Sequence, residues 1–293
     1  MAGGDQDQDL GADVDVDADL PETLRERCDA LVREFDDEVR ELREEELSFA
    51  REYVARALPV ELAHLRWRMP ESVHPTGVEL LVLLCGTSPQ PLLLSTSFVA
   101  PARVLLVGSD SREGRRAVGT VDGQLRELER RDASLSIERT PPCFIPASDP
   151  VGAYRTLASA IRRLQAELSL SDAALLADVT GRNKTMVAAA FLVCSELGLR
   201  SCYVDAEYDA KARMPRPCTA EFDLLEDPIA AYRVRELRRV ASLVSERRYA
   251  AAHELPDELR DHDRAVDPAD VEADLRALGV LRARSASTSA GST

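Results

Sequence analysis

The sequence lacks several features that mark membrane, disulfide-stabilised and nucleic-acid-coating proteins. It contains no run of about 18 apolar residues, the length that crosses a bilayer. Lys and Arg number 37 against 52 Asp and Glu, so we expect no extended nucleic-acid surface, although a local basic pocket is allowed. The six cysteines are scattered and include no CxxC pair, and we interpret them as reduced and structural.

A basic and apolar leader is also lacking, because residues 1–20 are rich in Asp. This stretch and the Ser-rich residues 282–293 have too little apolar content to pack, and we expect both to be disordered. We predict a cytoplasmic protein with no membrane partner.

The two common nucleotide-binding fingerprints are absent. Neither G-x-x-x-x-G-K-[ST] nor G-x-G-x-x-G occurs in the chain. We therefore expect no NAD, no ordinary nucleoside-triphosphate chemistry and no resident cofactor.

Helical segments flank a central region in which the apolar residues have a different spacing. Apolar residues recur every three or four positions from Pro21 to about Leu65. They predict one long, strongly charged amphipathic helix in an N-terminal helical segment, residues 21–70. Residues 225–281 are helical in pattern again and form a small C-terminal helical region, and no internal repeat is evident.

Strands and helices alternate in the central region, residues 76–224. Apolar runs predict strands at 78–86, 104–108, 135–140, 174–179 and 200–206, with helices at 89–99, 121–131, 150–168 and 184–198. This alternation predicts an α/β fold, a mainly parallel sheet with helices on both faces. Ligands of such sheets lie beyond the carboxyl ends of the strands.

Two of the predicted strand ends carry groups that bind anions. In CGTSPQP, Gly86 frees the backbone while Thr87 and Ser88 offer hydroxyls before a proline-started helix. In DVTGRNKTM, Thr180, Gly181, Arg182 and Asn183 form the turn, and Lys184 adds a positive charge beside a helix N-terminus. The alternative is that the hydroxyl and amide side chains only cap helices and that Lys184 is an ordinary surface residue.

These stretches together resemble a known family. LLVLLCGTSPQPLLLS, VLLVGS, ADVTGRNKTMVAAAF and CYVDAEYD are similar to segments of the CARF (CRISPR-associated Rossmann fold) proteins of type III CRISPR systems. The second loop of that family usually reads D-[ILV]-T-G-G-T-K-x-M. Asp178, Thr180, Gly181, Lys184 and Met186 match this pattern, whereas Arg182 and Asn183 replace Gly and Thr. The resemblance covers about residues 78–223.

The resemblance implies a Rossmann-like domain that forms a homodimer and binds a cyclic oligoadenylate in antiviral defence. Carried over by position, Gly86, Thr87 and Ser88 would contact ribose or phosphate. The residues that would line the phosphate path are Thr180, Gly181, Asn183 and Lys184, and the Arg182 guanidinium would either bind phosphate as well or point to solvent. If the protein is a ring nuclease, Lys184 and Ser88 would orient the ribose 2′-hydroxyl for attack on its own phosphate. The two replaced residues leave the ring size and cleavage open.

Two other functions remain alternatives at this point. Arg248 and His253 form an R-x4-H arrangement, similar to the motif of HEPN ribonucleases, in which Arg holds phosphate and His is the acid or base. The same helix also fits simple packing in a bundle. The third possibility is a CARF-linked transcription regulator with residues 267–281 in a winged helix, against which the acidity of the chain argues.

The acidic and histidine side chains are weak candidates for a metal site. Four carboxylates lie at or just beyond the ends of predicted strands and offer oxygen ligands for magnesium, namely Asp178, Asp205, Glu207 and Asp209. Asp178 is equally suited to bracing a turn, and we predict no metal. His64, His74 and His262 fit no metal spacing and are expected at the surface or in loops.

Overall fold

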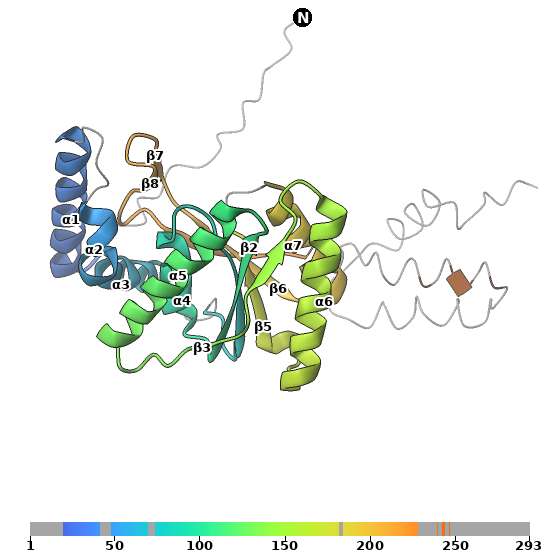
Figure 1. The fold of residues 1–293 in the computed structure, drawn as a ribbon. Coiled ribbons are helices and arrows are strands. Elements are labelled where there is room, and N and C mark those ends of the chain that lie inside the picture. Colours follow the sequence, from blue (N-terminus) through green and yellow to red (C-terminus); the bar gives the residue numbers. More distant parts are fainter. Residues whose placement is uncertain are drawn as a thin grey trace, which may run out of the picture. The chain divides into compact units, whose positions relative to one another are not determined.

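The computed structural model describes residues 20–41, 48–69, 74–181 and 184–227, together with Arg239, Ser242, Leu243 and Glu246 (Figure 1). The chain divides into two compact units, Met1–Glu226 and Asp227–Thr293. Almost all described residues belong to the first unit. The predicted tails and nearly all of the predicted C-terminal helical region, with Arg248, His253 and His262, lie outside the described residues.

A mixed, mainly parallel sheet forms the centre of the first unit (Figure 1). Its strands are β1 (Leu80–Leu84), β2 (Arg103–Ser109), β3 (Glu138–Arg139), β4 (Cys143–Ile145), β5 (Leu175–Asp178), β6 (Arg200–Asp205) and β9 (Glu221–Leu225). Their order is β3-β2-β1-β5-β6-β9, and β4 also pairs with β2. All pairs in this sheet are parallel except β6 with β9.

Helices cover both faces of this sheet. They are α1 (Glu22–Glu41), α2 (Ser48–Arg56), α3 (Leu58–Arg68), α4 (Gln90–Val99), α5 (Arg112–Arg131), α6 (Pro150–Leu168) and α7 (Lys184–Leu197). Leu81 and Leu83 of β1 belong to the core shared with α1–α5, whereas Leu80, Val82 and Leu84 belong to the core shared with α6 and α7. This alternation is the side-chain period of a strand that is buried on both faces.

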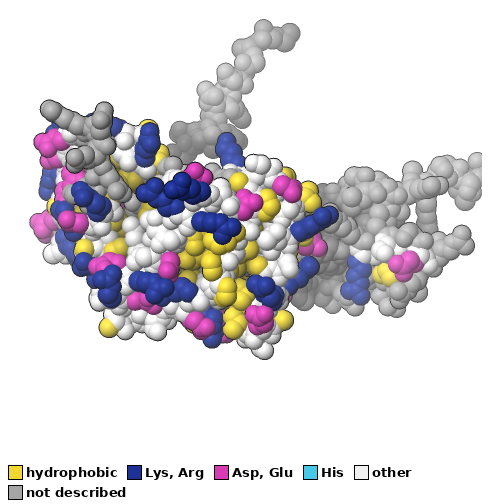
Figure 2. Space-filling view, in the orientation of Figure 1, with side chains coloured by type: hydrophobic (Ala, Val, Ile, Leu, Met, Phe, Trp, Pro, Cys, Tyr) yellow, Lys and Arg dark blue, Asp and Glu magenta, His cyan; other side chains and the backbone are white. Residues whose placement is uncertain are grey.

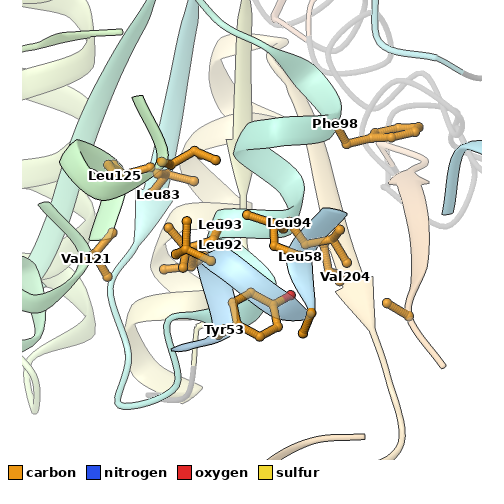
Figure 3. Close-up of a cluster of buried hydrophobic side chains, with 14 of the residues drawn as sticks. Tyr53, Leu58, Leu83, Leu92, Leu93, Leu94, Phe98, Val121, Leu125 and Val204 are labelled. Atoms are coloured by element: carbon orange, nitrogen blue, oxygen red, sulfur yellow. The ribbon is translucent and has the colours of Figure 1, made fainter. Parts of the chain in front are cut away.

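The larger of the two cores joins the N-terminal helices to the sheet. Figure 3 shows Tyr53 and Leu58 beside Leu92, Leu93 and Leu94 of α4. Because the residues of α4 from Leu92 to Phe98 are all buried, this helix lies between the sheet and α1–α3. Within the described ranges, no helix combines the length and the apolar content needed to span a bilayer.

The predicted fold class is confirmed by the sheet order and by the helices on both faces. The predicted single helix from Pro21 to about Leu65 is wrong, because α2 ends at Arg56 and α3 starts at Leu58. Pro59 lies in the first turn of α3, where a missing N–H is tolerated, but in the interior of a continuous helix it would clash with the preceding turn.

Three features of the strands were not predicted from the sequence. The predicted strand at 135–140 is only the two-residue β3, and β4 follows it as a separate strand. A small antiparallel hairpin, β7 (Tyr208–Asp209) with β8 (Met214–Pro215), follows β6. The chain then returns as β9, which pairs antiparallel with β6 and ends the sheet.

Candidate anion-binding site

The two predicted loops leave the sheet side by side. β1 and β5 are parallel neighbours, with Leu83 opposite Asp178, so both chains emerge at the same edge. From β1 the chain runs outward through α4 to β2, and it later crosses back through α6 to β5. The strand order therefore reverses between β1 and β5. Doubly wound sheets bind ligands outside the carboxyl ends of strands at such a reversal point.

The first loop, which we call the β1 loop, spans Cys85 to Pro89. Gly86 is half-buried, Thr87 is exposed, and the Ser88 hydroxyl donates a hydrogen bond of 3.2 Å to the carbonyl oxygen of Arg213. Pro89 is the N-cap residue of α4, and no described side chain caps this helix. Helix capping by Ser88 therefore does not explain the polar residues of this loop.

The second loop, which we call the β5 loop, spans Val179 to Lys184. Its first turn is held by Asp178, whose carboxylate accepts the backbone N–H of Thr180 at 2.9 Å. The Thr180 hydroxyl accepts the backbone N–H of Val204 in β6 at 2.8 Å. Lys184 is exposed and is the first residue of α7, whereas Arg182 and Asn183 lie outside the described residues.

Gly181 brings the β5 loop into close contact with the end of β1. A Cβ atom at Gly181 would lie 2.8 Å from the Leu84 Cβ and 3.0 Å from the Leu84 carbonyl oxygen. Only a residue without a side chain allows the β5 loop to approach the end of β1 this closely. The structure therefore brings Gly86, Thr87, Ser88, Thr180, Gly181 and Lys184 to one edge of the sheet.

Asp178 is fully buried beneath the two loops. Its second carboxylate oxygen accepts the Ser95 hydroxyl of α4 at 2.5 Å. Burial raises the pKa of Asp178, and the hydrogen bonds from Ser95 and Thr180 oppose that rise. Because its carboxylate accepts hydrogen bonds from Ser95 of α4 and from the Thr180 N–H, Asp178 stabilises the turn of the β5 loop.

Metal ligands are not gathered at this edge. Within the part of the chain that the structure describes, no three His, Cys, Asp or Glu side chains form a group that could hold a metal ion. Asp209 instead accepts the N–H groups of Lys211 and Ala212, each at 2.8 Å, and so fixes the turn of the hairpin. None of the six cysteines forms a disulfide.

The β7–β8 hairpin is a neighbour of the site that sequence reasoning missed. Its Arg213 has φ of 55° and presents the carbonyl oxygen that Ser88 contacts. On the other side of the hairpin, the Lys211 ammonium donates to the carbonyl oxygens of Val39 and Arg40 at the end of α1. Arg216 forms an ion pair of 3.0 Å with Asp36 of α1. The hairpin therefore connects the β1 loop to the N-terminal helices.

Two histidine predictions differ in outcome. His64 was expected at the surface or in a loop, but it is buried in α3, because this helix packs between α4 and the other N-terminal helices. His74 does lie in a loop, where its ring is 4.6 Å from the ring of Phe98.

The basic side chains on the face drawn in Figure 2 do not merge into one continuous surface. On the face drawn in Figure 2, Lys and Arg side chains form several separate groups with acidic side chains between them.

No family model and no curated protein matches the chain. Among solved structures it is similar to Enterococcus italicus Csm6 bound to cyclic hexa-2′-fluoro-hexa-dAMP, with 13% identity and a TM-score of 0.47 over 70% of this chain and 52% of that chain. It is also similar to Can2 from Sulfobacillus thermosulfidooxidans in complex with cyclic tetra-adenylate, with 18% identity and a TM-score of 0.32 over 53% of this chain and 38% of that chain. The chain therefore spans about half the length of this Csm6 and less of this Can2.

Proposed function

We propose that this protein is a cytoplasmic CARF-type sensor that binds a cyclic oligoadenylate in type III CRISPR antiviral defence. The observation that carries the proposal is the meeting of the β1 and β5 loops at the reversal point of the sheet. Backbone N–H groups at the start of α7, the Lys184 ammonium and the hydroxyl of Thr87 are suited to phosphate and ribose oxygens. The loop motifs that resemble the CARF family occupy these positions.

We further propose that two copies of the chain share one ring. Lys184, Ala188 and Leu192 are exposed at a spacing of four residues, which places them on one face of α7. Leu192 is 55% exposed, and Tyr203 of the neighbouring β6 is 36% exposed. A second copy that covers these apolar side chains would bring both Lys184 residues toward the two-fold axis, where a symmetric anionic ring fits.

Binding is tested with purified protein and with cyclic tetra-adenylate and cyclic hexa-adenylate as separate titrants. We expect one ring to bind tightly and Lys184→Ala to raise its Kd roughly tenfold or more, because a charge-assisted contact to phosphate is lost. Arg163→Ala is the matched control, since it removes one exposed cation, paired with Glu167, near the far end of α6. Equal affinity of the Lys184→Ala and Arg163→Ala variants would remove Lys184 from the site, and the absence of binding to either ring would reject the function.

The enzymatic alternatives are separated by incubating the protein with labelled ring and, independently, with labelled RNA. Cleavage of the ring alone assigns ring-nuclease activity to the two loops. Cleavage of RNA alone assigns activity to the region of Arg248 and His253. Recovery of both substrates intact leaves a sensor without these two activities.

A further inference from the structure

A buried hydrogen bond joins the helix that follows the β1 loop to the strand that precedes the β5 loop. The β1 loop leads directly into α4, which carries Ser95. The β5 loop begins directly after Asp178. The 2.5 Å hydrogen bond from the Ser95 hydroxyl to the Asp178 carboxylate therefore links the helix after one loop to the first residue before the other.

Both partners are shielded from water. Ser95 and Asp178 are each 0% exposed, and a buried hydrogen bond to a carboxylate is stronger than an exposed one because water does not compete for it. The other carboxylate oxygen of Asp178 accepts the N–H of Thr180. Thr180 is in turn tied to Val204 of β6. One chain of hydrogen bonds thus connects α4, the β5 loop and β6.

The neighbouring hydroxyls of α4 do not take part in this connection. Thr96 and Ser97 are buried like Ser95, and each donates to a carbonyl oxygen four residues earlier in the same helix, at 2.6 Å and 2.8 Å. The Ser95 hydroxyl is 3.2 Å from the Leu92 carbonyl oxygen and closer to Asp178. Of these three similar side chains, Ser95 is the one that donates to another element, at the end of β5.

We propose that Ser95 and Asp178 are positioning residues of the anion site, which hold the β1 and β5 loops in the geometry that receives the ligand. This inference rests on the proposed function, because it concerns the same site. Neither side chain contacts the ligand. They act through Thr180 and through the orientation of α4, so that the N–H groups of the β5 loop are ordered before the anion arrives. A site ordered in advance loses less conformational freedom on binding and therefore binds more tightly.

The variants Ser95→Ala and Asp178→Ala test this assignment, with Ser97→Ala as the matched control from the same helix. In titrations with cyclic tetra-adenylate and cyclic hexa-adenylate, we expect the first two variants to raise the Kd of the bound ring roughly tenfold or more. Ser97→Ala is expected to bind as the unaltered protein does, because its hydroxyl contacts only its own helix.

Asp178→Asn distinguishes whether Asp178 positions the β5 loop through its hydrogen bonds or only stabilises the core. An Asn oxygen can accept the Thr180 N–H, and its amide can donate to the Ser95 hydroxyl, whose proton then turns to the Leu92 carbonyl oxygen. We therefore expect this variant to restore most of the affinity that Asp178→Ala loses. If Asn and Ala at this position weaken binding equally, the assignment is wrong.

Hydrogen exchange of the ligand-free protein gives a readout that does not depend on the ligand. In Ser95→Ala, the amides of residues 179–181 and 184–187 are expected to exchange roughly fivefold faster or more, and in Ser97→Ala at an unchanged rate. Unchanged exchange in Ser95→Ala, or equal acceleration in both variants, overturns the inference. If the unaltered protein binds neither ring, the proposed function fails, and exchange alone then decides whether Ser95 holds the β5 loop.

Discussion

At the scale of single residues, the N-terminal helices contain a buried acid, Glu61, whose hydrogen-bond donors are uncharged. Glu61 of α3 accepts a hydrogen bond from the Tyr53 hydroxyl and one from the backbone of Cys218. Burial raises the pKa of Glu61 from its ordinary value of 4.5 to about 7, although both hydrogen bonds oppose the rise. The folded protein therefore holds this proton more tightly than the unfolded chain does.

This difference predicts how stability changes with pH. Because the folded pKa is above the unfolded pKa, the contribution of Glu61 is fully present below pH 4.5 and is lost as the pH rises through about 7. Over this range the loss amounts to about 3 kcal/mol. Glu61→Gln does not titrate and keeps an acceptor for Tyr53. We therefore expect the free energy of unfolding of the variant, relative to the unaltered protein, to rise by this amount between pH 4.5 and 8.

Urea unfolding of both proteins at a series of pH values measures this change. Titrating groups that do not interact with Glu61 contribute equally to the unfolding free energy of both proteins, so their contributions cancel in the difference. A difference in unfolding free energy that stays constant from pH 4.5 to 8 would show that Glu61 does not change its protonation in this range.

At the scale of elements, the same glycine substitution is expected to act in opposite directions in a loop and in a helix. Gly181→Ala places a methyl group 2.8 Å from Leu84, so we expect it to destabilise the fold by about 1–3 kcal/mol and to weaken ring binding. Gly119→Ala in α5 meets no atom within 4 Å and is expected to stabilise the fold by about 0.5–1 kcal/mol. Thermal unfolding of the two variants checks the pair. A Tm of Gly181→Ala at or above that of the unaltered protein would contradict the packing of Gly181 on β1, and a lowered Tm of Gly119→Ala would contradict the open surroundings of Gly119.

The sequence was most informative where strong local signals start an element. The predicted helix 150–168 agrees with α6 because Asp149 caps it and Pro150 is its first residue. The predicted start of α5 at residue 121 is wrong, since the helix begins at Arg112. Gly114, Gly119 and Gly123 disfavour a helix locally, and packing of the apolar side of α5 on the sheet outweighs that cost.

For the candidate site, the sequence indicated the two loops but not the contacts between residues far apart in the chain. The junctions after β1 and β5 were found because Gly, Thr, Ser and Lys interrupt apolar runs there. The contacts that shape these junctions join Ser95 to Asp178 and Ser88 to Arg213, which are 83 and 125 residues apart. Such pairs carry no periodic pattern, and the hairpin residues 208–215 are too few to show one.

At the scale of the whole molecule, the proposed dimer gives a prediction for the surface of α7. Leu192→Glu would place a carboxylate among the apolar side chains that the second copy covers, so we expect a monomer and weaker ring binding. Val151→Glu is the matched control, because Val151 of α6 is also 55% exposed. Light scattering after size exclusion measures the mass of each variant. A monomeric unaltered protein, or equal effects of the two variants, would contradict the proposed interface.

The hairpin that links the β1 loop to α1 also has a consequence for the order in which the chain can fold. Lys211 and Arg216 contact residues of α1 that precede them by between 171 and 180 positions. During synthesis, α1 leaves the ribosome long before these partners exist. Closing so long a loop is slow compared with forming local contacts. The contacts between α1 and the hairpin are therefore among the last that this helix can form.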